Sequence, residues 1–419
     1  MNILIRKAVI IEPGSSLNGK TKDILIVNGS ITRIDDHIDD QADQVIEQQH
    51  LCISPGWVDV FAHFCDPGYE FKETLQSGAD AAAAGGYTHV LILPNTNPVI
   101  HNKSQIEYIK EKSRSFAVHI HPIGAVSKNA EGKELAEMYD MFSSGAVAFG
   151  DGLKPVQSSG LLLKALQYVK AFNGVIIQLP DDKNIGTHGL MNEGIVSTRL
   201  GLPGKPAIAE EMMVARDIEL ADYTGSQLHF TGISSQKSLQ HIRSAKQKGL
   251  QVSCSVTPYH LFFTDEDLTG YDTNLKVNPP LRTSREREAL LQAVQEGLVD
   301  TISSHHQPQE WDSKTCEFEY AGYGMIGLET AFGVAGTLGI SAERWVEMCA
   351  VNARKIFNLP KTGIAEGVSA DITLFNPEHN YVFEEKHIRS KSKNSPFIGK
   401  TLKGKAIGII NGEKVFLNS

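Results

Sequence analysis

The sequence predicts an α/β protein: a (β/α)8 TIM barrel with a small β-sandwich domain formed by both termini. From about residue 55, short apolar runs typical of buried parallel strands alternate with stretches of helical periodicity. Eight such runs occur, and eight βα units in roughly 300 residues is the expected size of such a barrel. Before and after this region, apolar alternation between Gly, Asn and Asp turn signals indicates antiparallel strands.

The predicted barrel strands are separated by segments that must return the chain to the start of the next strand. One such segment, residues 191–221, has an acidic helix start and apolar residues at helical spacing, and we expect a packed crossover helix there. The eight strand runs are "WVDVFAHF" (57–64), "THVLILPN" (88–95), "AVHIHPIGAV" (117–126), "GAVAFGDG" (145–152), "GVIIQLP" (174–180), "SQLHFTGIS" (226–234), "LQVSCSVTP" (250–258) and "DTISSHHQP" (300–308).

The two ends of the chain are predicted to form the second domain together. The runs "ILIRKAVII", "DILIVNGSITRID" and "QVIEQQHLCIS" predict a small antiparallel sheet, and the same texture returns in "GKAIGIINGEKVFL". We therefore predict a β-sandwich domain from residues 1–52 plus 366–419 and a barrel domain from 53–365. The basic stretch "RSKSKNSP" (389–396) is interpreted as a solvated turn.

Composition excludes several classes of function. The formal net charge of −9 shows no basic face for phosphates, so neither nucleic acid nor an anionic membrane surface is an expected partner. No apolar run approaches the ~20 residues of a membrane helix, and the first residues lack the pattern of a signal peptide. Five scattered cysteines without a CxxC pair indicate reduced thiols in a cytoplasmic protein.

Side chains at the carboxyl ends of barrel strands face the mouth where barrel enzymes keep their active sites. Histidine and aspartate occur at these positions, but thinly spread, so the positions do not by themselves define a site. In strand order they are Phe61, His63 and Cys65; Asn95; His119 and His121; Asp151; Gln178; His229 and Gly232; Thr257 and His260; His305 and His306.

Over essentially its whole length, the chain resembles the dihydroorotases of the amidohydrolase superfamily, particularly those related to dihydroorotases that associate with aspartate carbamoyltransferase. The resemblance implies interconversion of carbamoyl aspartate and dihydroorotate in pyrimidine synthesis, at a zinc site on a TIM barrel. The matching stretches are "SPGWVDVFAHFCDPG", "LPNTNP", "AFGDGLKPVQSS", "MNEGIVSTRLGLPGKPAIAEEMMVARDIELA", "KVNPPLR", "YGMIGLETAF", "VNARKIFNLP", "GIAEGVSADITLFNPE" and "SPFIGKTLKGK".

The family's metal-binding pattern is broken in this chain. The family carries His-x-His and then Arg at the first strand, a carboxylate after the fourth, histidines after the fifth and sixth, and Asp after the eighth. One acid, Asp151, remains after the fourth strand, although its alignment to the ligand is uncertain by one residue. Phe61, Gln178 and Gly232 stand where the family has histidines, and Cys65 stands where it has the arginine. In the eighth-strand motif, "Thr-Asp-His-Ala-Pro-His" in the family, His305 replaces the aspartate and Gln309 replaces the last histidine.

The favoured interpretation is a pseudoenzyme with no cofactor, which acts in an oligomer as a structural or regulatory partner, with aspartate carbamoyltransferase as the candidate. The alternative is an active dihydroorotase or related cyclic amidohydrolase with an atypical zinc site on His63, Asp151 and His305. A third interpretation keeps Asn95 and Asn278 as remnants of a pocket that still binds a carbamoyl or dihydroorotate-like ligand.

Overall fold

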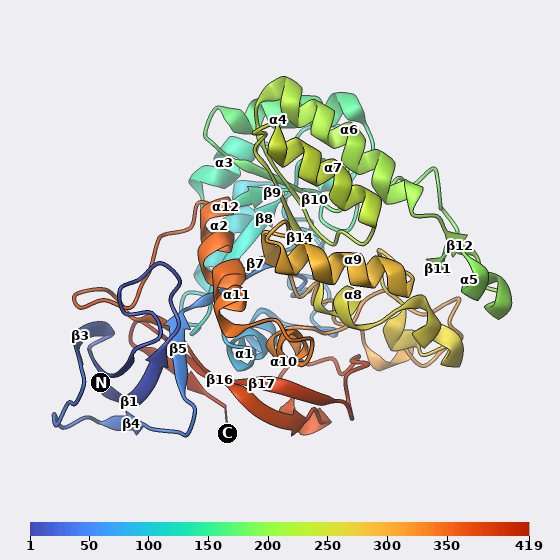
Figure 1. The fold of residues 1–419 in the computed structure, drawn as a ribbon. Coiled ribbons are helices and arrows are strands. Elements are labelled where there is room, and N and C mark those ends of the chain that lie inside the picture. The colour runs from blue at the N-terminus through green and yellow to red at the C-terminus, as the bar shows by residue number, and fades with distance from the viewer. Residues whose placement is uncertain (419) are drawn as a thin grey trace.

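The computed structural model describes residues 1–418 and contains the predicted barrel (Figure 1). Eight parallel strands follow the spatial order β15-β14-β13-β10-β9-β8-β7-β6. Each of the eight predicted runs overlaps one of them, so the barrel prediction is confirmed. Their bounds are β6 Trp57–Ala62, β7 Tyr87–Ile92, β8 His119–Gly124, β9 Ala148–Phe149, β10 Val175–Gln178, β13 Gln227–Phe230, β14 Val252–Val256 and β15 Thr301–Ile302.

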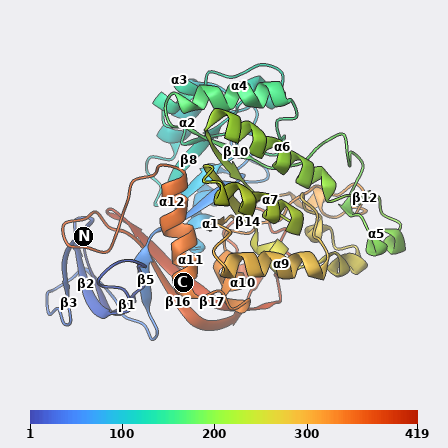
Figure 2. The same ribbon diagram turned by 45° about the horizontal axis from the view of Figure 1, so that its top comes forward.

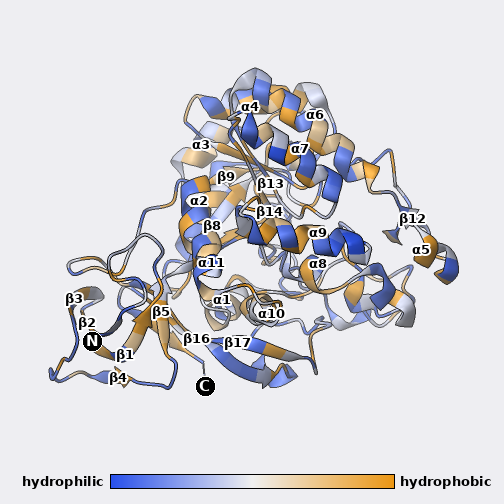
Figure 3. Ribbon diagram, viewed as in Figure 1, coloured by the Kyte–Doolittle hydropathy of each residue, from blue (hydrophilic) through white to orange (hydrophobic). Residues whose placement is uncertain are grey.

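Helices surround the barrel strands, and Figure 3 shows hydrophilic and hydrophobic stretches alternating along them, as expected when one side packs on the strands. The α-helices are α1 Leu75–Ala84, α2 Lys103–Lys112, α3 Met138–Ser143, α4 Ser159–Lys170, α5 Ile195–Leu200, α6 Ile208–Thr224, α7 Gln236–Gln247, α8 Pro258–Phe262, α9 Ser284–Gln295, α10 Ala331–Thr337, α11 Ala342–Val346 and α12 Ala353–Ile356, with a π-helix at Glu347–Asn352. Short 3₁₀ segments occupy Lys128–Ala130, Asp265–Gly270, Thr273–Leu275, Trp311–Ser313 and Glu385–His387.

The segment predicted as one crossover helix, residues 191–221, is divided. It begins with β11 Met191–Asn192, continues through α5 to β12 Gly204–Lys205, which pairs with β11, and only then enters the long helix α6. Pro203 and Pro206 flank β12 and Gly201 ends α5 in a left-handed conformation, so a continuous helix is excluded. This excursion projects from the barrel beside α9 (Figures 1 and 2).

Both termini build one second sheet, as predicted, with the order β18-β17-β16-β5-β1-β2-β3 and with β4 beside β1. The N-terminal part is not wholly antiparallel as expected, because β4 and β5 run parallel to β1. The antiparallel pairing of β16 with β5 joins the two ends of the chain. The bounds are β1 Asn2–Ile10, β2 Thr21–Val27, β3 Ser30–Asp35, β4 Gln44–Ile46, β5 Cys52–Pro55, β16 Asp371–Val382, β17 Thr401–Asn411 and β18 Lys414–Leu417.

Aromatic packing connects this sheet to the barrel. The Trp57 ring at the start of β6 lies with its centroid 5.2 Å from that of Phe375 on β16 and 5.5 Å from that of Trp345 on α11. All three side chains are fully buried, and such rings bury more apolar area than any other side chain. The terminal sheet and the barrel therefore share one apolar core here.

The barrel has a seam between its first and last strands. Among residues 1–418 no backbone ladder joins β6 to β15. The seam is bridged instead by single hydrogen bonds, in which His63 N donates to His306 O at 2.8 Å and Ser304 N donates to the Asp59 carboxylate at 2.6 Å. Across residues 1–418, no helix combines the length and apolarity needed to span a membrane.

Residues 388–397, here called the strap, pass over this seam at the mouth of the barrel. The prediction of a solvated turn at 389–396 is wrong, because Ser390, Ser392, Asn394 and Ser395 are all buried. The Asn394 amide donates to the carbonyl oxygens of Gln307 and Gly324 at 3.1 Å and accepts from Gln309 N. The Asn394 side chain of the strap thus satisfies backbone hydrogen-bonding groups in the loop after β15.

Candidate functional site

The structure brings the predicted site residues to one end of the barrel. Phe61 is near the end of β6 and His63 follows it, Gln178 is the last residue of β10, and His305 follows β15. Cys65, Asn95, Asp151, Gly232 and Gln309 likewise lie just beyond the carboxyl ends of strands. This is the mouth of the barrel, where this architecture holds its chemistry.

Phe61 and His305, two of the positions that the resemblance assigns to metal ligands, pack against each other. Their ring centroids are 4.5 Å apart and tilted by 31°, and both side chains are buried. At Gly232 an added Cβ would meet His305 Cε1 at 2.6 Å. The His305 ring therefore occupies the space beside Gly232 that a side chain at that position would need.

Hydrogen bonds hold His305 in this place. Its Nε2 atom lies 2.7 Å from the Thr231 hydroxyl, which also accepts from Ser255 at 2.9 Å. Ser255 in turn lies 3.2 Å from Nε2 of His229, another fully buried histidine. Burial lowers the pKa of both His305 and His229 to about 3, so both rings are neutral at pH 7.

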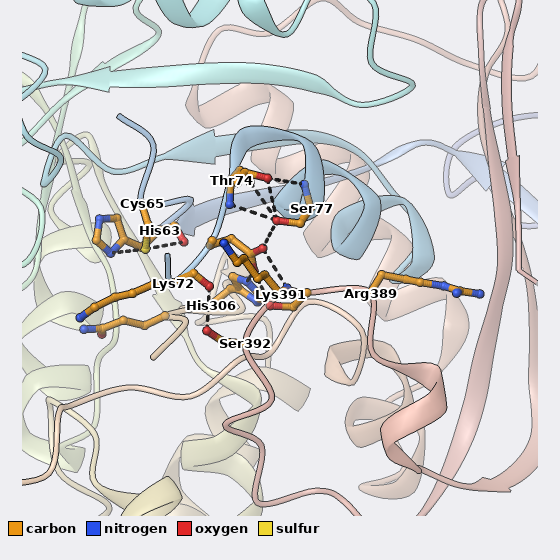
Figure 4. Close-up of polar contacts among 12 residues, drawn as sticks. His63, Cys65, Lys72, Thr74, Ser77, His306, Arg389, Lys391 and Ser392 are labelled. Carbon is orange, nitrogen blue, oxygen red and sulfur yellow. Dashed lines mark hydrogen bonds and ion pairs between the residues drawn. The ribbon is translucent and has the colours of Figure 1, made fainter. Parts of the chain in front are cut away.

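His63 is held between a backbone carbonyl and a thiol. Its Nε2 is 3.0 Å from Asn95 O, which fixes the proton on Nε2 and leaves Nδ1 as an acceptor 3.6 Å from Cys65 Sγ (Figure 4). Burial lowers the pKa of His63 to about 4 and raises the pKa of the Cys65 thiol far above its ordinary value. Cys65 is thus a neutral buried thiol, and it cannot provide the charge-assisted carboxylate contact of an arginine.

The carboxylate of Asp151 is turned to the loop after β8. One oxygen accepts from Ser127 N at 2.9 Å and the other from the Ser127 hydroxyl at 2.5 Å. The next residue, Gly152, has φ +60°, and a Cβ there would lie 2.0 Å from Asn95 Oδ1. The Asp151 carboxylate is therefore not directed at the centre of the mouth, and position 152 has no room for a side chain.

Gln178 is also engaged with a neighbour. Its Nε2 donates to Asp217 Oδ2 on α6 at 3.2 Å, and the other Asp217 oxygen accepts from Arg216 Nε at 2.7 Å. Burial raises the pKa of Asp217 to about 6. A histidine at position 178 would therefore face a buried carboxylate that the carboxamide now satisfies.

Gln309 ties two mouth loops together. Its Oε1 accepts from Lys72 Nζ and its Nε2 donates to Tyr323 O, both at 2.7 Å. Asn95 is likewise occupied, since its amide donates to Asp151 O at 3.0 Å and its Oδ1 accepts from Leu153 N at 2.8 Å. The site residues thus bind one another and the backbone.

Sequence reasoning missed the buried carboxylate of Glu73. It accepts from the hydroxyls of Ser77 and Ser390 and from Lys391 N, and it lies 3.4 Å from His306 Nε2. Figure 4 shows the strap residues Lys391 and Ser392 converging with His306 on the loop that carries Lys72. The sequence does place a charged residue, Glu73, directly before Thr74, the N-cap of α1. It does not show that this carboxylate is buried, because most of its partners are distant in sequence.

A cavity of about 250 Å³ lies at the mouth. Lys205 Nζ lies 2.7 Å from both Asp181 carboxylate oxygens and from Asn278 Oδ1, and Asn278 Nδ2 donates to Asp181 at 3.2 Å. Of the two predicted pocket residues, Asn278 lines this cavity, whereas Asn95 is not among its lining residues. Its walls are Leu153, Asp181, Lys183, Gly186, Thr187, Gly189, Lys205, Asn278, Gln307 and Tyr323.

Known proteins are similar to this chain along its whole length. A family profile described as Dihydro-orotase-like matches residues 51–238. The dihydroorotase of Syntrophus aciditrophicus is 41% identical over 424 residues, which cover 99% of each chain. The chain belongs to the dihydroorotase family. The dihydroorotase of Pelotomaculum thermopropionicum is 40% identical and covers 100% of this family member and 99% of its own length.

Solved structures support the same fold. The L-hydantoinase (dihydropyrimidinase) of Arthrobacter aurescens superimposes with a TM-score of 0.87 at 23% identity, covering 99% of this dihydroorotase-family chain and 96% of that one. A D-hydantoinase gives a TM-score of 0.84 at 19% identity. At these identities the likeness concerns the fold alone.

The dihydroorotase family implies zinc, but the side chains of this member do not fit it. A catalytic zinc ion needs three protein ligands, mostly imidazole, thiolate or carboxylate groups, and one open position. Within residues 1–418, no three His, Cys, Asp or Glu side chains are grouped so that they could hold a metal ion. The structure does not bring His63, Asp151 and His305 together as ligands, because each is directed at another partner.

Proposed function

We propose that this chain is a dihydroorotase-family protein of pyrimidine synthesis that does not catalyse zinc-dependent ring hydrolysis. The main observation behind this proposal is that the Phe61 and His305 rings pack together and that the His305 ring occupies the space beside Gly232. These are three of the positions that the resemblance assigns to metal ligands. Gln178 adds a fourth position that is satisfied by Asp217. The named relatives support the assignment to the pathway, and the packing supports the loss of the metal chemistry.

The first experiment measures turnover and bound metal on one sample. The purified protein is given zinc, tested with carbamoyl aspartate and with dihydroorotate, and its metal content is determined. The dihydroorotase of Syntrophus aciditrophicus, prepared in the same way, serves as the positive control. We expect neither turnover nor stoichiometric zinc; zinc bound at one ion or more per chain together with turnover would contradict the proposal.

The alternative is an active dihydroorotase with an atypical zinc site, and the full-length identity of about two fifths to proteins named dihydroorotase favours it. Under this alternative His305 is a ligand or a base. His305→Ala would then abolish both turnover and zinc binding. Activity that is present and unchanged in this variant would exclude His305 from the chemistry.

As part of the same proposal, the protein acts as a structural or regulatory partner of aspartate carbamoyltransferase. An intact barrel without a ligand set would contribute surface rather than catalysis. The test is size-exclusion chromatography of the two proteins from one organism, mixed at micromolar concentrations. Joint elution ahead of either component supports the partnership, and separate elution counts against it.

A further inference from the structure

The wall of the mouth cavity contains an ion pair between Lys205 and Asp181, in which the lysine already has all its hydrogen-bond acceptors. A lysine ammonium has three protons to donate, and Lys205 has three acceptors at 2.7 Å, namely both Asp181 oxygens and Asn278 Oδ1. The Lys205 and Asp181 side chains are only 12% and 4% exposed, so the pair is shielded from water. Lys205 therefore has no proton left for a ligand.

We infer that the mouth cavity selects an uncharged cyclic ureide over a carboxylate-bearing one, with Asp181 as the residue that sets this preference. The inference rests on the proposed function, in which the mouth does not hydrolyse a cyclic amide, and it adds that the mouth still binds one. A ligand carboxylate would meet the Asp181 carboxylate and would find Lys205 already paired. Like charges at such short range in a shielded site repel each other and disfavour binding, whereas a neutral ring avoids this repulsion.

The remaining polar groups of the cavity match a ureide. Ureides offer N–H donors and C=O acceptors side by side. Asp181 retains lone pairs that can accept an N–H, and Asn278 Nδ2 retains a second proton after its bond to Asp181. Gln307, also in the wall, has a carboxamide that can both donate and accept hydrogen bonds. The cavity of about 250 Å³ has room for one small ring.

Backbone contacts fix the charged pair in the wall. Arg282 is buried and donates from Nη1 to Lys205 O at 3.1 Å and to Asn192 Oδ1 at 3.0 Å. The Tyr323 hydroxyl donates to Gly189 O at 3.1 Å and closes the same rim. The cavity is thus built by rigid contacts from three loops, as expected for a formed ligand site.

The test is isothermal titration of the full-length protein with 5,6-dihydrouracil, which is neutral, and with L-dihydroorotate, which is an anion. We expect the wild-type protein to bind dihydrouracil at least about tenfold more tightly. Asp181→Asn frees the Lys205 charge, and we expect it to reverse the preference, with dihydroorotate gaining at least about tenfold. Asp181→Asn/Lys205→Met removes both charges and should restore the preference for the neutral ring.

Lys183→Met is the matched control, because it removes a positive charge from the exposed rim of the same cavity. We expect the ratio of the two affinities to change less than about threefold. A wild-type protein that binds dihydroorotate more tightly, that binds neither probe, or whose preference is unchanged by Asp181→Asn would overturn the inference. Turnover is not part of this readout, so catalytic activity would contradict the proposed function while leaving the affinity ratio to decide the inference.

Discussion

The Cε1 atom of His305 lies 2.6 Å from the point where a Cβ at residue 232 would sit, so the imidazole and a side chain at 232 exclude each other. We predict that Gly232→Ala lowers the free energy of unfolding by about 2–4 kcal/mol, from this overlap and from the backbone at φ +69°. In a His305→Ala background the same change should cost only about 1 kcal/mol, since only the backbone strain remains.

A double-mutant cycle by urea denaturation measures this coupling, which we expect to be about 1–3 kcal/mol. Gly249→Ala is the control, because Gly249 has φ +79° and nothing within 4 Å of an added Cβ. It should cost about 1 kcal/mol in both backgrounds. Additive effects of the changes at 232 and 305 would show that the overlap does not matter.

Restoring one ligand should not restore the metal. Phe61→His leaves Gln178, Gly232 and His305 in place, and we predict no zinc above the wild-type level by elemental analysis. A combined variant, which should gain bound zinc, carries Phe61→His, Cys65→Arg, Gln178→His, Gly232→His and His305→Asp. Stoichiometric zinc in Phe61→His alone would show that this position is the sole defect.

Stability should fall on acidification partly because of His305. Burial lowers its pKa from 6.5 to about 3, so between these values the unfolded chain takes up a proton that the folded chain does not. The stability contributed by this residue is complete above pH 6.5 and is lost toward pH 3, at up to about 1.4 kcal/mol per pH unit.

The measurement compares the wild-type protein with His305→Gln in urea titrations at pH 7, 6 and 5. The variant should show a shallower loss of stability. Asp217, whose pKa is raised to about 6, acts in the opposite direction in both proteins and cancels from the comparison. Identical slopes would mean that His305 has the same pKa in the folded and unfolded states.

The strap should stabilise the mouth through its buried amide. Asn394→Ala removes three hydrogen bonds to Gln307, Gly324 and Gln309, and we predict a loss of about 2–3 kcal/mol in the free energy of unfolding. Lys391→Ala is the control. It removes an exposed side chain but keeps the main-chain bond to Glu73, so it should cost less than about 1 kcal/mol.

Limited proteolysis provides a second readout for the strap. Cleavage within residues 305–326 should be faster in Asn394→Ala than in Lys391→Ala, because the loop after β15 loses its partner. Equal stability and equal cleavage of the two variants would place the strap outside the cooperative core.

The barrel strands were predictable because each is an apolar run bounded by polar or glycine-containing turns, a signal carried by neighbouring residues. The parallel placement of β4 and β5 beside β1 was not, since pairing direction depends on distant segments. The strap was misjudged for the same reason. Its Ser, Lys and Asn residues are typical of solvated turns, while their partners lie far away along the chain, and Glu73 is about three hundred positions from Ser390.

For the site, the resemblance predicted which ligand positions are replaced but not which groups satisfy the residues that now stand there. Gln178 was identified as a replaced ligand, yet its partner Asp217 lies on a helix that no local pattern connects to it. The Lys205–Asp181 pair was missed because each residue alone resembles an ordinary loop charge. Contacts between side chains of separate loops are absent from any single stretch of sequence.

The pairing of β5 with β16 and the strap across the seam bear on how the chain is made. The ribosome releases residues 52–55 long before 371–375, so β5 keeps an unpaired edge while the whole barrel is synthesised. The mouth loops likewise wait for residues 390–394, which are synthesised after them. The terminal sheet and the barrel mouth are therefore completed only after the barrel strands have been made, and a chain without residues 388–418 would lack β17, β18 and the strap.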